Sequence, residues 1–104
     1  MYLPKLYKEF SEKHPELLEA YQKLGKTCRE TGPLDEKIQD LVNLGIAIGA
    51  NSRGAVMSQT RKARASGSGR EEIEHVVLLS LTTTGFPNMM AAMRWVDDVL
   101  KEDA

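Results

Sequence analysis

The sequence predicts an all-α domain of five to six helices, a single domain over residues 1–104. Apolar residues recur every three or four positions, which is the period of an α-helix. Pro and Gly stand where these runs begin and end, as is typical of helix boundaries. No segment alternates apolar and polar residues as a half-buried strand would. The most β-branched segment, HVVLLSLTTT at 75–84, follows a helix-start signal and is therefore also predicted to be helical.

The first two helices are delimited by proline and glycine. Pro4 fits the first turn of a helix that runs to about Lys13. Pro15 fits the first position of the second helix, with His14 as its cap, and Gly32 with Pro33 ends it. The second helix carries an apolar stripe at helical spacing, made by Leu17, Leu18, Tyr21, Leu24 and Cys28.

The third and fifth helices are predicted to be strongly buried. The third begins near Asp35 and becomes apolar on all sides towards Gly49, which is typical of a buried helix. Gly45 and Gly49 either allow the backbone of another segment to approach the helix closely, or merely lower its helix propensity. For the fifth, Ser68 and Glu71 predict a capping box. Its buried residues are predicted to be Ile73, Val76, Val77, Leu78, Leu79 and Leu81, before a stop at Gly85.

The remaining helices flank these two. After the break at ANSRGAV, residues 50–56, a helix is predicted to run to about Ala65. Pro87 opens the last helix. Its apolar residues, which include Met89, Met90, Met93 and Trp95, are predicted to lie in the core or at a subunit interface.

Composition narrows the function classes. The formal net charge is -1, from 14 basic and 15 acidic side chains, which argues against nucleic acid or an anionic membrane as partner. The single cysteine, Cys28, excludes an intrachain disulfide, a dithiol pair and a cysteine-rich zinc site. The amino-terminal segment has no apolar signal region, and residues 41–50 are too short an apolar run to span a bilayer. We expect a cytoplasmic protein that needs no metal or cofactor.

The order of three segments resembles a known family. LDEKIQDLVNLGIAIGA is followed by SRGAVMSQTRKA and then by SGSGREEIEHVVLLSLTTTGFPNMMAAMRWVDDVL. Together, over about residues 33–100, they resemble the carboxymuconolactone decarboxylase family, which includes the alkyl hydroperoxidase AhpD-like proteins. The resemblance implies an AhpD-like helical fold. Two very apolar helices in so short a chain have more apolar surface than one domain can bury, which together with the resemblance predicts a homo-oligomer. The resemblance implies a homotrimer or homohexamer with sites near subunit contacts.

The resemblance also assigns positions, and this chain departs from them. In redox members a glutamate precedes a Cys-x-x-Cys pair and a histidine follows it. Asp40 takes the glutamate position, Ser52 and Ala55 take the cysteine positions, and Gln59 takes the histidine position. Disulfide exchange needs an attacking and a resolving sulfur, so the family's thiol peroxidase activity is not expected here. The decarboxylase branch does without these cysteines.

The predicted helix start at Ser52 has two interpretations. Ser52 is either a structural N-cap or part of an anion site. In the second interpretation, the free amides at Gly54 and Ala55 and the guanidinium of Arg53 bind a small carboxylate, lactone or enolate. The family's further histidine falls on Gly54, which leaves those amides uncovered.

Asp40 is the candidate acid or base. It is either a solvated acid near the start of its helix or, if buried facing Ser52 or Gln59, a general acid or base. Gln59 can orient a ligand or water but cannot shuttle a proton. Asp40, Ser52 and Gln59 are therefore the catalytic candidates, and Arg53, Gly54 and Ala55 are the substrate-binding candidates.

The other polar residues are less specific. His75 is predicted to be packed or half exposed, and with His14 it makes no recognisable metal site. A local basic cluster is either a solvated face or a site for an anionic substrate tail, and consists of Arg61, Lys62, Arg64 and Arg70.

Three functions follow as hypotheses. The first is an enzyme that binds and decarboxylates a small carboxylate or lactone at the Ser52 helix start. The second is a non-catalytic oligomeric protein that binds a ligand or serves as a scaffold. The third is the peroxidase activity associated with the family.

Overall fold

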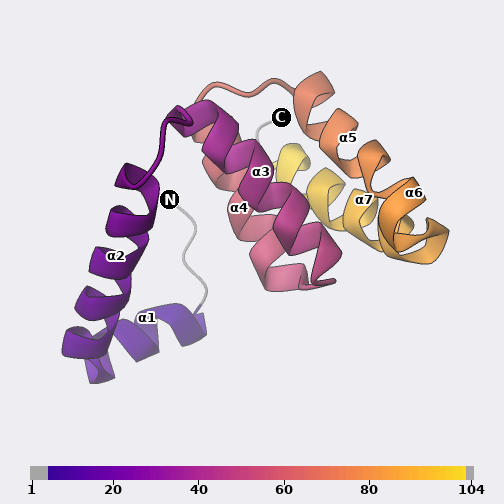
Figure 1. Cartoon of the computed structure of the whole chain (residues 1–104). Coiled ribbons are helices and arrows are strands. Elements are labelled where there is room, and N and C mark those ends of the chain that lie inside the picture. Colours follow the sequence, from indigo (N-terminus) through magenta and orange to yellow (C-terminus); the bar gives the residue numbers. More distant parts are fainter. Residues whose placement is uncertain (1–4, 103–104) are drawn as a thin grey trace. The chain divides into compact units, whose positions relative to one another are not determined.

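Every element of the computed structural model, which describes residues 5–102, is a helix (Figure 1). The predicted all-α class is confirmed, and α6 is only a single turn. The helices are α1 (Lys5–Lys13), α2 (Pro15–Glu30), α3 (Glu36–Gly49), α4 (Arg53–Ala65), α5 (Arg70–Leu79), α6 (Leu81–Thr84) and α7 (Phe86–Lys101). Pro4, predicted to open the first helix, lies outside the described residues.

The contacts of the chain group into two units, the first ending at Pro33 and the second beginning at Leu34. The first unit contains α1 and α2, and neither helix has a buried residue. Pro15 stands in the first turn of α2, as predicted, but the His14 side chain makes no capping hydrogen bond there. An isolated pair of helices without a core is marginal in water, so this unit depends on further contacts for stability.

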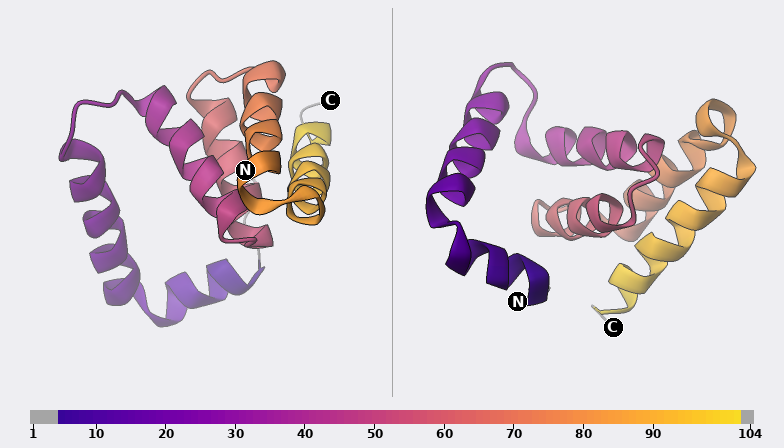
Figure 2. Two further views of the ribbon diagram at one scale, coloured as in Figure 1. Left: turned by 45° about the vertical axis from the view of Figure 1, so that its right-hand side comes forward. Right: turned by 90° about the horizontal axis from the view of Figure 1, so that it is seen from below.

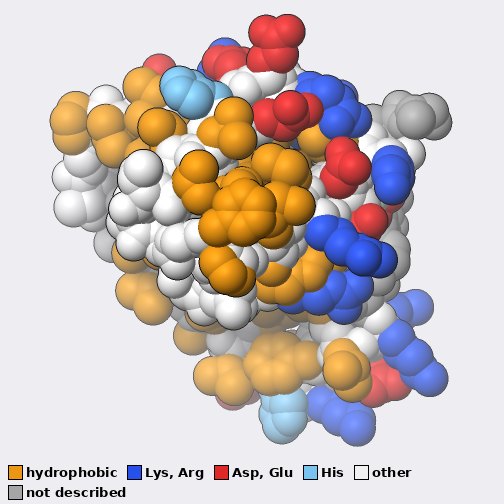
Figure 3. Space-filling view, turned by 90° about the vertical axis from the view of Figure 1, so that its right-hand side faces the viewer, with side chains coloured by type: hydrophobic (Ala, Val, Ile, Leu, Met, Phe, Trp, Pro, Cys, Tyr) orange, Lys and Arg blue, Asp and Glu red, His pale blue; other side chains and the backbone are white. Residues whose placement is uncertain are grey.

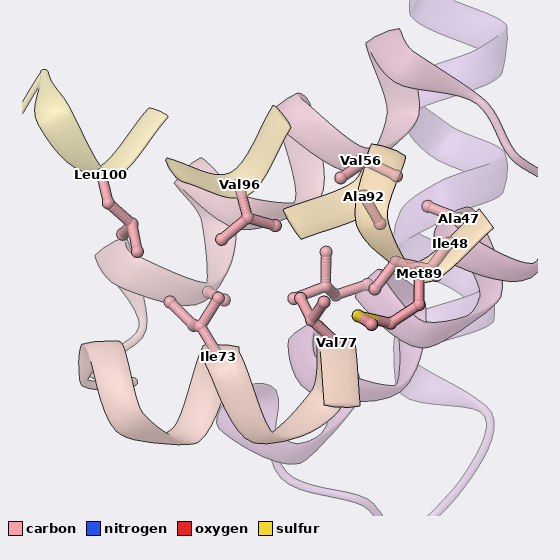
Figure 4. Packing of buried hydrophobic residues seen from close by; sticks show 11 residues of the cluster. Ala47, Ile48, Val56, Ile73, Val77, Met89, Ala92, Val96 and Leu100 are labelled. Carbon is pink, nitrogen blue, oxygen red and sulfur yellow. The ribbon is translucent and has the colours of Figure 1, made fainter. Parts of the chain in front are cut away.

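The second unit has the hydrophobic core. Its buried side chains come from α3, α4, α5 and α7 and point towards one another (Figure 4). Leu44, Ile48, Val56 and Ile73 are each 0% exposed. The rest of the cluster is Ala47, Ala63, Val77, Met89, Ala92, Val96 and Leu100. A core of this size stabilises the second unit because each such side chain leaves water completely on folding.

The turn between α3 and α4 is a Schellman motif that leads directly into an N-cap. The amide of Asn51 donates to the Ile48 carbonyl at 2.9 Å, and that of Ser52 donates to the Ala47 carbonyl at 3.3 Å. Asn51 occupies the left-handed position, with φ 53°, which asparagine tolerates better than most residues. Because only three residues join the helices, α3 and α4 form a tight antiparallel hairpin (Figure 2).

The start of α5 differs from the prediction by one residue. The N-cap is Gly69, so the predicted Ser68 cap is wrong. Glu72, not Glu71, accepts the Gly69 amide at 3.0 Å, and it also pairs with Lys37 at 3.0 Å. Both partners hold the pKa of Glu72 below its ordinary value, and the hydrogen bond from the Gly69 amide has the larger effect. Glycine has no side chain to return the bond, so only half of a capping box forms.

The predicted burial of α3 and α5 is only partly correct. Ile73 and Val77 are buried, but Leu78 is 51% and Leu79 61% exposed. On α3, Ile46 is 65% exposed. The apolar pattern of these helices thus covers more than the core of one chain. No helix among the described residues is both long and apolar enough to cross a membrane.

Asn88 ties α7 to two earlier helices. Its side-chain Nδ2 donates to the Ile48 carbonyl in α3 and to Thr84 Oγ1 in α6, both at 2.9 Å. Thr84 Oγ1 in turn donates to the Ser80 carbonyl at 2.9 Å. Both hydrogens of the amide are therefore used, and the direction of the network is fixed.

Candidate functional site

The α3–α4 hairpin brings Asp40 and Gln59 to within about one helical turn of the same level. Nine residues separate Asp40 from the end of α3, a rise of about 14 Å, and six separate Gln59 from the start of α4, about 9 Å. Asp40 is only 2% exposed, so it is not the solvated acid that was one interpretation of the sequence. It is also already engaged by another group.

Gln59 has an unused hydrogen-bond acceptor. Its Oε1 is buried, and no donor reaches it among the described residues. A buried polar atom without a partner is costly, and such atoms are uncommon in folded proteins. The oxygen can accept a hydrogen bond from a ligand or water but cannot transfer a proton.

Ser52 forms three hydrogen bonds with the backbone around the turn. Its amide donates to α3, its carbonyl accepts the Val56 amide at 2.9 Å, and its Oγ accepts the Ala55 amide at 3.4 Å. All three polar groups therefore shape the hairpin. This arrangement favours the interpretation of Ser52 as a structural N-cap.

The anion-binding interpretation retains two amides and one cation. The amides of Arg53 and Gly54 precede the first bonded amide of α4, so no carbonyl of that helix can accept from them. Both residues are exposed, and Ala55 is half-buried. An anion at this end would sit in water, where a helix terminus and one guanidinium provide little affinity.

Asp40 and Arg53 do not form one site. Arg53 opens α4 at the turn, whereas Asp40 lies about 14 Å along α3 from that turn. A carboxylate held by Arg53 would therefore be out of reach of the Asp40 carboxyl group. The structure brings Asp40 to the level of Gln59 and leaves Ser52, Arg53, Gly54 and Ala55 together at the other end.

Neither histidine nor Cys28 is a residue of the α3–α4 hairpin. Cys28 is exposed on α2 and His75 is exposed on α5. His14 lies beside Phe10, with ring centroids 5.4 Å apart. Within residues 5–102, no three His, Cys, Asp or Glu residues come together in a group that could hold a metal ion.

Two arginines of the basic cluster are engaged in ion pairs. Arg61 binds Glu102 through two hydrogen bonds, of 2.9 and 3.1 Å. Arg70 lies 3.4 Å from both Glu74 and Asp97. Neighbouring acids thus neutralise part of the cluster, which favours the solvated-face interpretation over a site for an anionic tail.

An apolar groove lies between α3, α5 and α6, and sequence reasoning missed it. We call it the α3–α5 groove; its volume is about 430 Å³. None of the predicted site residues lines it. The signal was the surplus of apolar residues on α3 and α5, from which the sequence predicted a homo-oligomer but no groove. The lining residues are Ile38, Leu41, Val42, Gly45, Gly49, Val76, Leu79, Ser80, Thr83 and Thr84.

Comparison with known proteins identifies similar chains. The sequence pattern of the carboxymuconolactone decarboxylase family matches residues 15–98, so the matched region includes α2. Two uncharacterized proteins of Methanocaldococcus jannaschii are each 33% identical to this chain. The first aligns over 84% of this chain and 85% of its own length, and the second over 82% and 79%.

A solved structure has a similar fold. It is the apo form of a carboxymuconolactone decarboxylase family protein from Legionella pneumophila, with a TM-score of 0.77 and 20% identity. The similarity covers 90% of this chain and 84% of that chain. At this identity the likeness concerns the fold alone.

Proposed function

We propose, from the premise that this chain belongs to the carboxymuconolactone decarboxylase family, that it is a non-redox binding member. In this proposal it is a cytoplasmic, self-associating helical scaffold that holds a small ligand and does not catalyse a reaction. The observation that carries the proposal is the separation within the hairpin. The buried acid, Asp40, and the free helix end at Arg53 lie about 14 Å apart along α3, so they do not act on one small substrate.

The absence of sulfur at the family's redox positions supports the same proposal. Ser52 and Ala55 occupy those positions, and Ser52 is used by the turn. The only thiol, that of Cys28, is on a helix of the other unit. Thiol peroxidase activity requires two sulfurs that exchange a disulfide, so it is the least favoured function.

A decarboxylase that uses Asp40 is the second candidate. One observation favours it: Asp40 is buried near the level of Gln59, whose Oε1 has an unused acceptor. In such a site Gln59 would orient a small acid or lactone, while Asp40 would supply or remove a proton. The two residues would then act without Ser52 or Arg53.

Three measurements separate these functions. We expect no release of CO2 from carboxylated lactones, but saturable binding of a small carboxylate in calorimetry. Turnover that Asp40→Asn abolishes would replace the binding proposal with the decarboxylase. Peroxide reduction that Cys28→Ala abolishes would replace it with thiol chemistry.

The location of the ligand needs its own control. Gln59→Leu removes the open acceptor, and Arg53→Ala removes the cation at the turn. Lys62→Ala removes an exposed cation from the other end of the same helix and is the matched control. We expect binding to weaken with one of the first two variants and not with the control. Equal affinity in all three variants would contradict a site in the hairpin.

A further inference from the structure

Two glycines of α3, Gly45 and Gly49, line the α3–α5 groove and leave the backbone uncovered there. A Cβ placed on Gly49 would meet no atom within 4 Å, and one on Gly45 would meet only Val76 Cγ1, at 3.8 Å. The two glycines therefore are not required for packing within the second unit. They leave the groove open to the close approach of another helix. The walls are apolar except for the hydroxyl groups of Ser80, Thr83 and Thr84 at one end.

The chain also contains an amphipathic helix, α2, in whose own unit no helix has a buried residue. The α2 stripe consists of Leu17, Leu18, Tyr21, Leu24 and Cys28. Leu17 is 59%, Tyr21 71% and Leu24 61% exposed. At about 100° per residue, Lys23 and Lys26 fall on the other side of the helix. The stripe is therefore a continuous apolar surface without a charge along it.

We propose that a second copy of this chain covers the α3–α5 groove, and that the segment of that copy which enters it is α2. The two surfaces match in length. The α2 stripe spans twelve residues, from 17 to 28, and the groove follows α3 over twelve residues, from 38 to 49. Each is about 17 Å long. Both are apolar, so the contact removes hydrophobic surface from water without desolvating a charge.

The extent of exposed apolar surface favours a second copy as the occupant. Leu78, Phe86 and Met90 lie outside the groove and are 51%, 60% and 45% exposed. Figure 3 shows hydrophobic side chains gathered on the face that carries α5, α6 and α7. One helix in the groove would leave this face uncovered, whereas a whole second chain brings further surface to it.

The size of a reciprocal contact also fits. When two copies exchange α2, each contributes its five stripe residues and its ten groove residues. These are fifteen residues per copy, and the exposed Leu78, Phe86 and Met90 outside the groove bring the contact closer to the ~20–30 residues per side of a stable interface. The exchange is symmetric, since the same two surfaces of each copy are used, and it closes at two copies. A hexamer built from three such pairs contains the same contact.

This inference rests on the self-association in the proposed function, and the two can fail separately. The first experiment measures mass against concentration by light scattering for three chains. Leu24→Glu places a charge on the stripe, and Val42→Glu places one in the groove. Lys26→Gln makes the same change in net charge on the opposite side of α2 and is the matched control. Leu24 and Val42 are 61% and 46% exposed in one chain, so neither variant disturbs the core.

We expect the unchanged chain and the Lys26→Gln control to form the same assembly. The stripe and groove variants should each associate about a hundredfold more weakly, because a carboxylate would be buried in an apolar contact. Assemblies that Leu24→Glu leaves intact would keep self-association but overturn the role of α2. A chain that is monomeric at every concentration would overturn both.

The second experiment uses Cys28, the only thiol of the chain, to identify the occupant. The unchanged protein is mixed with a Cys28→Ser chain that carries Ile38→Cys or Thr83→Cys, one at each end of the groove, and the mixture is oxidised. A disulfide between the two different chains is expected at one of these positions and not at Ser58→Cys, an exposed site on α4. A further chain keeps Cys28 and carries Ile38→Cys or Thr83→Cys. If this chain closes a disulfide within itself on oxidation, and the mixture forms none between different chains, the occupant is the chain's own α2 and the proposal is overturned.

Discussion

Replacing Asn88 with aspartate tests whether the hydrogen bonds that join α7 to α3 and α6 require a donor at position 88, as the structure indicates. The change keeps the shape of the side chain but removes both donated hydrogen bonds, which at about 1 kcal/mol each contribute about 2 kcal/mol. It also sets a carboxylate against the Ile48 carbonyl and Thr84 Oγ1, close to the negative end of α3. That repulsion adds about 1 kcal/mol.

The expected loss for Asn88→Asp at neutral pH is therefore about 3 kcal/mol, or roughly 15 °C in melting temperature for a chain of this size. Asn88→Ala should lose less, about 1–2 kcal/mol, because it brings no charge. Urea unfolding followed by circular dichroism measures both differences against the unchanged protein.

The pH dependence gives the sharpest check. The oxygens around the introduced carboxyl group disfavour its charged form, so its pKa should be raised in the folded state above the unfolded value of about 3.9. A raised pKa means that the protonated form contributes stability below about pH 4, which is lost as the pH rises through the folded value. The deficit of Asn88→Asp relative to the unchanged protein should therefore shrink in acid. An aspartate variant no less stable than the alanine variant at pH 7, or a deficit independent of pH, would refute the reasoning.

Three further predictions concern the second unit. Ile73→Ala should destabilise it by about 2–5 kcal/mol in urea unfolding, because Ile73 is 0% exposed within the core; a loss below 1 kcal/mol would contradict that packing. Glu72→Gln should lower stability at pH 7 and reduce the loss of stability in acid, because the pKa of Glu72 is lower in the folded state than in the unfolded state. The charged Glu72 stabilises the fold at pH values above the unfolded-state pKa, and this contribution is lost as the pH falls through the folded-state pKa. Unchanged pH curves from thermal melts would contradict this. Arg61→Met should cost no more than about 1 kcal/mol and be insensitive to 1 M salt, whereas the unchanged protein should lose a similar amount in that salt, because the Arg61–Glu102 pair is partly exposed.

The sequence predicted helix limits well where one residue type determines them. Asp35 caps α3, with its Oδ1 accepting the Ile38 amide at 2.9 Å, and Ser52 caps α4, both at the predicted positions. The prediction failed at Ser68, because serine and glycine are both acceptable N-caps and the acids at 71 and 72 fit either choice. Local chemistry fixed the existence of that helix but not its first residue.

Burial was the less predictable property. A periodic apolar pattern indicates that a helix face is covered but not by what, so Ile73 and Leu79 look alike in sequence although one is 0% and the other 61% exposed. The alignment of Asp40 with Gln59 follows from counting residues through the hairpin. The open acceptor of Gln59 and the Asn88 network do not, because they depend on how side chains from distant parts of the chain pack.

The three residues between α3 and α4 act as a spacer of fixed length. Backbone hydrogen bonds hold Ala50, Asn51 and Ser52 in one conformation. One inserted residue would therefore rotate α4 by about 100° and move position 59 away from position 40. Any sequence that keeps this spacing keeps those two positions near one level, whichever side chains it places there. Redox cysteines can therefore be gained or lost on this hairpin without rebuilding the fold around them.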